Sequence, residues 1–434
     1  MSATILSGAT PSGTRYRIDV PESWNQVLLL YSRGVPVGPD DPPWDEDEAM
    51  FAALLADGYA VAGSGGPIFW PLEDSFRNQE ALLDEFEREI GAPRSTIAFG
   101  YSIGGIITAG LVQVLPARLS GALPMCGNLA GAVGIHNREL DIAFVLKTLL
   151  APESALELVR IADPRANLRL AEAMFEEAVA SPHGRARLAL AAAVGNIPGW
   201  HDPLLPEPAA DDYPTQLENQ VGWYREPGLL VYFFLRAQVE AQAGGNPSWN
   251  TGVDYGDLLQ RSINREQVEG LYAEAGADLT ADLATLAGAE RIAADPGAVQ
   301  YLERNIVFTG DLGGVPVLTL HTDGDGLVTP DNEHAYADVV RSAGQEELLR
   351  QLHVHRGGHC TFTVAESLVA LGRLRERIET GDWPSLDPAA LNDAAAALGP
   401  ARNLLARGGE PASPGFFDFA PWAFSRPYDV RDAV

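Results

Sequence analysis

The fold of this chain is decided by Ser95-Thr-Ile-Ala-Phe-Gly100-Tyr-Ser102-Ile-Gly104-Gly105-Ile-Ile-Thr-Ala-Gly110. The β-branched and aromatic residues before Gly100 predict a short strand, and the apolar run after Gly105 predicts a helix. Between them Gly100-Tyr-Ser102-Ile-Gly104 fits the G-x-S-x-G pattern, in which a strained strand-to-helix turn lifts a serine hydroxyl above the end of a parallel sheet. Ser102 is therefore the candidate nucleophile. The alternative is an ordinary serine in a glycine-rich turn.

Strands and helices alternate on both sides of this stretch. Residues 4–20 alternate apolar and polar positions, as an antiparallel hairpin at a sheet edge does. Continuous apolar runs predict buried strands, and amphipathic or apolar runs between them predict helices. The strands are expected at 27–31, 59–63, from 121, 315–320 and 348–353, and the helices at 49–56, 72–90, 332–343 and 366–379. This alternation predicts an α/β fold with a mostly parallel sheet flanked by helices.

The pattern changes in the middle of the chain. After about residue 130, helical segments rich in Ala, Leu and Glu alternate with Pro- and Gly-containing loops until about residue 310. We therefore predict core residues 1–130, a helical insertion at 131–310, and a second core part with a tail at 311–434. The aromatic tail around Phe416 and Trp422 is expected to pack back onto the body.

Composition limits the partners and the location. The chain has 434 residues and a formal net charge of −29. A nucleic-acid or anionic membrane surface needs clustered Lys and Arg, so neither partner is expected. The N-terminus lacks the basic start and apolar stretch of a signal peptide, and no apolar run reaches membrane-spanning length. The expected location is the cytoplasm, although a trimmed, secreted form would have the same sequence.

A serine nucleophile needs an acid and an imidazole. Asp325 follows the strand predicted at 315–320 and is the candidate acid. The alternative at this position, Asp323, is expected to form a turn with its own backbone. A calcium loop is a further alternative, but the pattern lacks a third acid before its glycine and a glutamate at the twelfth position.

The candidate imidazole is His359. It follows two glycines after the strand predicted at 348–353, which lets the ring swing over a serine. His353 and His355 share one strand face and are expected to be structural, because a metal pair there would need further ligands.

An oxyanion hole needs two backbone N–H groups aimed at the developing charge. Ile103, the residue after the nucleophile, is expected to supply one of them. The loop after Tyr31 is expected to supply the other, through Gly34 or Val35.

Taken together, the segment from Gly100 to Gly105, the Asp325 loop and the His359 loop resemble the α/β-hydrolase superfamily. The resemblance covers residues 1–130 and 310 to about 380. Within the superfamily the chain is similar to bacterial serine hydrolases with a large helical cap, often grouped with esterases or prolyl-oligopeptidase-like peptidases. Related hydrolases often carry His-Gly at the oxyanion loop, where this chain has Arg33 before Gly34.

The pair His359-Cys360 is similar to tannase and feruloyl esterases, in which a Cys after the catalytic His is bonded to one just before the Ser. This chain has Tyr101 before Ser102, so that bridge cannot form. The chain has only two cysteines, Cys126 and Cys360. Our hypothesis is that Cys360 instead approaches Cys126. Two cysteines are too few for a disulfide scaffold.

Aromatic residues are the candidates for substrate binding, because ligand sites are mainly apolar with a few polar anchors. These candidates are Tyr101, Trp200, Trp223, Tyr224 and Trp249. The alternative is that the aromatics of residues 131–310 form the core of the insertion. Asp211, Asp212 and Glu218 are open to two interpretations: recognition of a substrate amine, as in an aminopeptidase, or solvated loop residues.

The predicted function is hydrolysis of a carboxylic ester or lactone through an acyl-enzyme. A serine peptidase or amidase is the first alternative. The same triad could also serve an acyltransferase or a carbon–carbon bond hydrolase, and a non-catalytic binding protein would use the same fold. The expected substrate is small, neutral and partly apolar. No cofactor or metal is implied, and the sequence does not reveal the oligomeric state.

Overall fold

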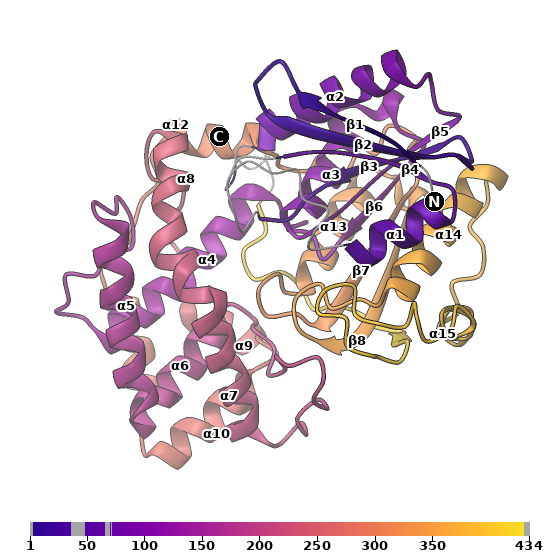
Figure 1. Ribbon diagram of the computed structural model, residues 1–434. Coiled ribbons are helices and arrows are strands. Elements are labelled where there is room, and N and C mark those ends of the chain that lie inside the picture. Colours follow the sequence, from indigo (N-terminus) through magenta and orange to yellow (C-terminus); the bar gives the residue numbers. More distant parts are fainter. Residues whose placement is uncertain (1–2, 36–47, 66–69, 71, 429–434) are drawn as a thin grey trace.

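The computed structural model describes residues 3–35, 48–65, 70 and 72–428. The chain folds into a nine-stranded sheet with helices on both faces and a separate group of helices beside it (Figure 1). The strands are β1 (Ala3–Ala9), β2 (Arg15–Pro21), β3 (Val27–Ser32), β4 (Ala60–Ser64), β5 (Ser95–Tyr101), β6 (Gly121–Met125), β7 (Val317–Gly324), β8 (Leu349–Gly357) and β9 (Phe416–Phe417).

The strands lie in the order β1-β2-β4-β3-β5-β6-β7-β8-β9. The six strands from β4 to β8 in that order are parallel to their neighbours, whereas β1, β2 and β9 pair antiparallel. The predicted N-terminal hairpin is thus confirmed and forms one edge of the sheet. The register brings Ser32 beside Gly100 and Tyr101 beside Met125, so these strands end at a common edge.

The central strands are apolar throughout because both faces of the sheet are covered. Leu28 and Leu30 on β3 pack on one side, with helices α2 and α3. Leu29 and Tyr31 pack on the other side, with α1 and α14. The predicted α/β class is therefore confirmed.

The helices of the sheet layer are α1 (Glu48–Ala56), α2 (Leu72–Glu89), α3 (Ile103–Val114), α13 (Asp331–Ser342), α14 (Val364–Thr380) and α15 (Pro388–Ala397). Those between β6 and β7 are α4 (Gly131–Leu150), α5 (Pro164–Val179), α6 (Pro182–Val194), α7 (Tyr213–Trp223), α8 (Arg236–Ala243), α9 (Tyr255–Arg261), α10 (Arg265–Ala275), α11 (Leu279–Gly288) and α12 (Pro296–Arg304). The sequence did not predict α15, an alanine-rich helix whose buried residues are Leu391 and Ala395.

The helices between β6 and β7 have a hydrophobic core of their own, which residues from α4 to α11 form. In Figure 1 most of these helices stand apart from the sheet as a second body. The domain boundaries predicted at 130 and 310 lie close to the start of α4 and the end of α12, and the division into domains stays a prediction. None of the helices in the described part of the chain has the length and hydropathy needed to cross a lipid bilayer.

Candidate active site

Ser102 occupies a strained turn between β5 and α3. Its backbone has φ 59° and ψ −122°, in the left-handed range of φ that non-glycine residues rarely adopt. The turn is so tight that a Cβ on Gly104 would stand 1.9 Å from the Ser32 carbonyl oxygen, and one on Gly100 would stand 2.3 Å from it. The Ser102 N–H donates to the Met125 carbonyl at 3.0 Å and ties the turn to β6. The sequence therefore needs glycine on both sides of the serine.

Asp325 and His359 meet at the ends of β7 and β8. The Nδ1 atom of His359 lies 2.6 Å from the Asp325 Oδ2 atom. The other oxygen, Oδ1, accepts the N–H groups of Leu327 at 3.0 Å and Val328 at 2.9 Å. Asp325 is fully buried, so these bonds hold the carboxylate in one position. With Nδ1 donating to Asp325, the Nε2 atom of neutral His359 is left as the acceptor that a general base requires.

The candidate nucleophile, acid and base all follow strands that end at one edge of the sheet. Ser102 follows β5, Asp325 follows β7 and His359 follows β8. The strand between them, β6, is extended by Cys126, whose N–H donates to the Leu320 carbonyl at 2.8 Å. Because Cys126 is bonded to Cys360, the His359 loop is drawn toward the end of the strand that neighbours β5.

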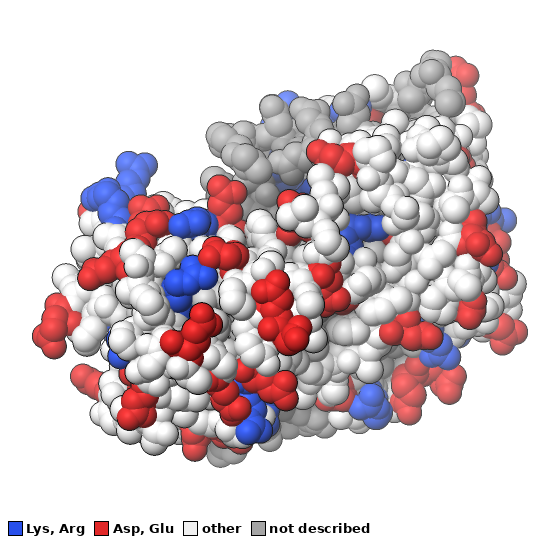
Figure 2. Space-filling model, turned by 90° about the horizontal axis from the view of Figure 1, so that it is seen from below, with Lys and Arg blue, Asp and Glu red and all other residues white. Residues whose placement is uncertain are grey.

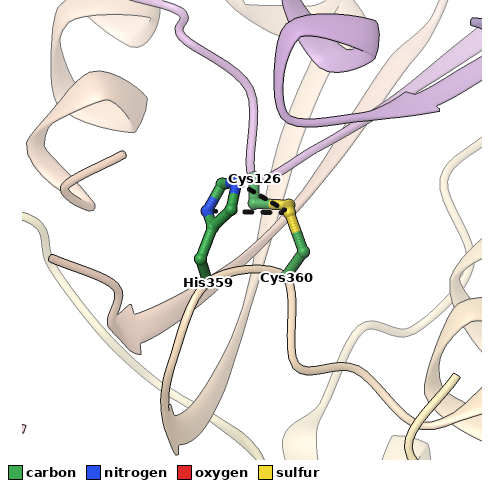
Figure 3. A group of neighbouring side chains, drawn as sticks. All are labelled: Cys126, His359 and Cys360. Atoms are coloured by element: carbon green, nitrogen blue, oxygen red, sulfur yellow. Dashed lines mark hydrogen bonds between the residues drawn. A yellow bond between two sulfur atoms is a disulfide. The ribbon is translucent and has the colours of Figure 1, made fainter. Parts of the chain in front are cut away.

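The disulfide between Cys126 and Cys360 lies directly against the imidazole of His359 (Figure 3). The two Cα atoms are 5.6 Å apart, and the Cys360 Sγ atom is 3.4 Å from the Nε2 atom of His359. The hypothesis that these two cysteines approach each other is confirmed. Disulfides are typical of oxidising compartments, and the cytoplasmic location stays a prediction.

The same three residues are the group in the described part of the chain that could hold a metal ion. Their ligand atoms lie within 4.8 Å of one another. A cysteine binds metal as a thiolate, and the disulfide leaves neither sulfur in that form. When the disulfide is formed, His359 is therefore the one residue of these three that is able to bind a metal ion.

Removing this disulfide is expected to destabilise the protein. It joins residues 234 positions apart, and a cross-link that closes a long loop restricts the unfolded chain strongly. We expect the double variant Cys126→Ala/Cys360→Ala to lose about 2–4 kcal/mol of unfolding free energy, measured by urea denaturation. Dithiothreitol should shift the unfolding midpoint of the wild type and leave that of the double variant unchanged. Equal midpoints for the two oxidised proteins would contradict the expectation.

Gly34 lies next to the candidate nucleophile. A Cβ built on Gly34 would be 3.7 Å from the Ser102 Cβ atom and 3.5 Å from the Tyr101 carbonyl oxygen. Val35 is 38% exposed and continues the same loop. Ile103 is the first residue of α3, where N–H groups lack an acceptor within the helix and the helix dipole favours a negative charge. The loop after β3 and the start of α3 thus both lie next to Ser102, and the oxyanion hole stays a prediction.

Sequence reasoning did not identify Gln79, which holds the start of this loop. Its Nε2 atom donates to the Tyr31 carbonyl at 2.7 Å and lies 2.9 Å from the Ser32 Oγ atom. Gln79 is buried on α2, far from β3 in the sequence. A polar residue on the apolar face of a well-patterned amphipathic helix is the signal that could have revealed it.

A buried ion pair lies behind Asp325. His321 Nε2 is 2.8 Å from the Val328 carbonyl and 3.7 Å from the Asp325 Oδ2 atom, and its Nδ1 atom is 3.2 Å from the Glu333 Oε1 atom. Both ring nitrogens face acceptors, so the ring is the doubly protonated imidazolium. Burial is the strongest single influence and opposes its charge, but the hydrogen bond and charge of Glu333, the charge of Asp325 and the Val328 carbonyl together raise the pKa of His321. The buried, positively charged ring of His321 thus lies 3.7 Å from the Asp325 carboxylate.

Glu333 belongs to the same network from the first turn of α13. Its second oxygen, Oε2, accepts the Thr319 hydroxyl and the Gln351 amide, the latter at 2.5 Å. Burial opposes ionisation of the carboxyl, but the bonds from His321 and Thr319 lower the pKa of Glu333. Sequence reasoning did not identify the contact between His321 and Glu333.

We expect Glu333→Gln to destabilise the protein by about 3 kcal/mol. The reason is that removal of one partner leaves the other charge, on His321, buried and uncompensated. Asp338→Asn on the same helix is the matched control. Asp338 is half exposed and pairs with Arg341 on the surface, so its loss should cost less than about 1 kcal/mol. Chemical denaturation of both variants measures the difference, and similar losses would contradict a charged pair.

Asp323 has a different role from the one expected. It lies within β7 rather than in a turn, and its Oδ2 atom is 2.7 Å from the Nδ1 atom of His355 on β8. Its Oδ1 atom accepts the Arg356 N–H at 2.9 Å. The expectation of a turn-forming residue was wrong because the strand continues to Gly324. The predicted structural role of His355 fits this cross-strand contact.

Two of the predicted aromatic residues lie over the loops that carry the acid and the base. A Cβ on Gly326 would be 2.5 Å from the Trp223 indole, and one on Gly357 would be 2.7 Å from the Trp200 indole. Trp223 Nε1 also donates to the Trp200 carbonyl at 3.0 Å. These tryptophans attach the insertion to the ends of β7 and β8.

The remaining aromatic candidates lie in three other places. Tyr224 is fully buried and its hydroxyl donates to the Leu188 carbonyl, within the core of the insertion. Trp249 packs edge-on against Tyr428 near the C-terminal end. Tyr101 is buried immediately before Ser102. The structure therefore does not bring Tyr224 to a surface that a substrate could contact.

The acids considered for amine recognition have partners elsewhere. Asp212 caps α7 by accepting the Thr215 N–H at 3.2 Å. Glu218 pairs with Arg185 at 2.7 Å. Asp211 is exposed. These contacts favour the interpretation as surface residues.

The sheet order, the strained serine turn and the acid–imidazole pair define a serine hydrolase of the α/β-hydrolase fold. The chain belongs to the family of the o-phthalyl amidase from Xanthobacter agilis. The two sequences are 30% identical over an alignment of 418 residues, which covers 89% of this chain and 89% of the relative. No family model matches the chain.

Solved structures with similar folds include an esterase from Aspergillus oryzae, with a TM-score of 0.42 and 15% identity over 88% of this chain and 80% of the other. Feruloyl esterase B from Aspergillus oryzae has a TM-score of 0.40 and 16% identity over the same shares.

Proposed function

We propose that the protein hydrolyses a carboxylic acyl bond through an acyl-enzyme formed on Ser102. The observation that carries the proposal is the 2.6 Å contact between Asp325 and His359 at the sheet edge where Ser102 stands in its strained turn. This contact supports a neutral His359 with the proton on Nδ1 and with Nε2 as the acceptor nitrogen.

In the proposed first half of the reaction, the Ser102 Oγ atom attacks the substrate carbonyl while His359 Nε2 takes the hydroxyl proton. The N–H of Ile103 and one from Gly34 or Val35 stabilise the resulting oxyanion. His359 then gives the proton to the leaving group, and the bond to the carbonyl carbon breaks. In the second half, water attacks the ester on Ser102, with His359 again acting as base and then as acid.

The bond cleaved in this proposal is an amide of an aromatic carboxylic acid. The relative that shares 30% identity along 89% of this chain is an o-phthalyl amidase, and this supports amide cleavage over the ester preferred from the sequence. Ester hydrolysis is the second candidate, because the same acyl-enzyme forms from an ester with a better leaving group.

Paired chromogenic substrates test the proposal. We expect release of 4-nitroaniline from N-(4-nitrophenyl)phthalamic acid, and covalent labelling of Ser102 by a fluorophosphonate probe. Turnover of 4-nitrophenyl esters without any turnover of the anilide would favour the esterase. An enzyme that neither labels nor cleaves either substrate would overturn the proposal in favour of a binding protein.

A further inference from the structure

The chain segment around Arg407 is held against the loop that carries His359. The Ala406 N–H donates to the Phe362 carbonyl at 2.8 Å, and the Val364 N–H donates to the Leu404 carbonyl at 3.0 Å. Thr363 and Leu405 form an isolated bridge between the same two segments. Arg407 is therefore fixed relative to the candidate base, although 48 positions separate them in the sequence.

The guanidinium of Arg407 lies beside the candidate nucleophile. Its Nη2 atom is 3.8 Å from the point where a Cβ on Gly34 would stand, and the Ser102 Cβ atom is 3.7 Å from that same point. The guanidinium carbon stands 5.7 Å from the centroid of the Tyr101 ring. Because Tyr101 is buried and precedes Ser102, the ring gives the cation a fixed surface to rest on.

A positive charge at this place contrasts with the rest of the molecule. The formal net charge is −29, and Figure 2 shows acidic side chains spread over the face that it presents. An anionic substrate therefore meets a repulsive field over most of the surface. A carboxylate bound next to Ser102 would need a local cation, and Arg407 supplies one.

We propose that Arg407 binds a carboxylate on the acyl part of the substrate, next to the carbonyl that Ser102 attacks. This inference rests on the proposed function and assigns the residue that recognises the second carboxylate of a phthalic acid monoamide, the substrate class that the name of the o-phthalyl amidase relative implies. In such a compound the carboxylate and the reacting carbonyl stand on adjacent ring carbons. The Arg407 Nη2 atom and the Ser102 Cβ atom lie 3.8 Å and 3.7 Å from one point, so they are at most 7.5 Å apart and one substrate can contact both groups.

The guanidinium suits this task by its chemistry. It is planar, stays charged at all working pH values, and offers five N–H donors in a fork that fits both carboxylate oxygens. Five donors allow a carboxylate to bind while other contacts of the side chain persist. The selected substrate is a monoanion, which differs from the neutral substrate expected from the overall charge.

Substrate pairs that differ in one carboxylate test the proposal. We expect the wild type to cleave N-(4-nitrophenyl)phthalamic acid with a kcat/KM about 10- to 100-fold above that for N-(4-nitrophenyl)benzamide, as one charged hydrogen-bonded contact warrants. The terephthalic isomer, whose carboxylate is in the para position, should behave like the benzamide. Arg407→Gln should lose the preference, because its kcat/KM for the ortho acid should fall about 10- to 100-fold, toward the value for the benzamide.

Binding of free phthalate separates this inference from the proposed function. Phthalate should slow fluorophosphonate labelling of Ser102 in the wild type and in Arg225→Gln, a control at an exposed ion pair in the insertion. Protection should be lost in Arg407→Gln and partly kept in Arg407→Lys. Thermal unfolding of each variant shows that it is folded.

The outcomes exclude different statements. Absence of labelling and of all turnover would overturn the proposed function itself. Normal labelling combined with equal protection of the wild type and Arg407→Gln, or with equal rates for the ortho acid and the benzamide, would overturn the role of Arg407 alone.

Discussion

Ser102→Ala is expected to lower kcat by about 10⁶-fold, because the hydroxyl that forms the acyl-enzyme is gone and the other groups act through it. Residual activity should exceed the uncatalysed rate, since Ile103 and the Gly34 loop can still polarise a bound carbonyl. The measurement is kcat with the proposed anilide and with a 4-nitrophenyl ester, together with fluorophosphonate labelling.

The control for this variant is Ser342→Ala, an exposed position in the last turn of α13. It should keep wild-type rates and labelling. Retention of labelling by Ser102→Ala would show that another residue is the nucleophile. The unfolding free energy of Ser102→Ala should equal or slightly exceed that of the wild type, because this variant loses one buried hydroxyl and keeps the strained backbone.

Asp325→Asn is expected to lower kcat by about 10⁴-fold at pH 7. The amide has nearly the same size as the carboxylate, but its NH₂ group can make the Nδ1 atom of His359 an acceptor and place the proton on Nε2. The ring would then be in the tautomer that cannot accept the proton of Ser102. Steady-state kinetics on the same substrates measure the loss.

The matched control is Asp323→Asn, two residues earlier on β7. Asp323 contacts His355 and the Arg356 N–H, and neither belongs to the proposed reaction. Its loss should change kcat by less than about tenfold. Equal losses for the two aspartates, or a larger loss at Asp323, would show that the assignment of the acid to Asp325 is wrong.

The elements nearest to the site follow from local sequence patterns. The strand and helix around Ser102, the strand before Asp325 and the strand before His359 were all predicted and lie within a few residues of their observed bounds. Gly100 and Gly104 indicated the tight turn in the sequence, and the structure shows that the turn has no space for a side chain at either position. The order of serine, acid and histidine was expected from the resemblance to α/β-hydrolases, in which the acid and the histidine follow the serine along the chain.

Other features depend on contacts between distant segments. Nothing in the local pattern at Asp323 showed that β7 continues past it, because the strand is prolonged by pairing with β8. Trp223 and Tyr224 are adjacent in the chain, yet one packs on the Asp325 loop and the other within the insertion, since helical neighbours point in different directions. The partner of His321 was not predicted because Glu333 lies on the following helix. Apolar periodicity marks buried apolar residues and does not show that a glutamate is buried.

The sequence by itself therefore determined the type of fold, the strained turn at Ser102 and the chemical types that stand at the sheet edge. These features depend on residues close together in the chain, whose conformations are limited by sterics and by apolar periodicity. The tertiary structure alone decided that Arg407 lies beside Ser102, that Gln79 holds the loop after β3 and that an ion pair stands behind Asp325. Each of these contacts joins segments that only packing of the folded sheet brings together, and no local pattern encodes such a distance.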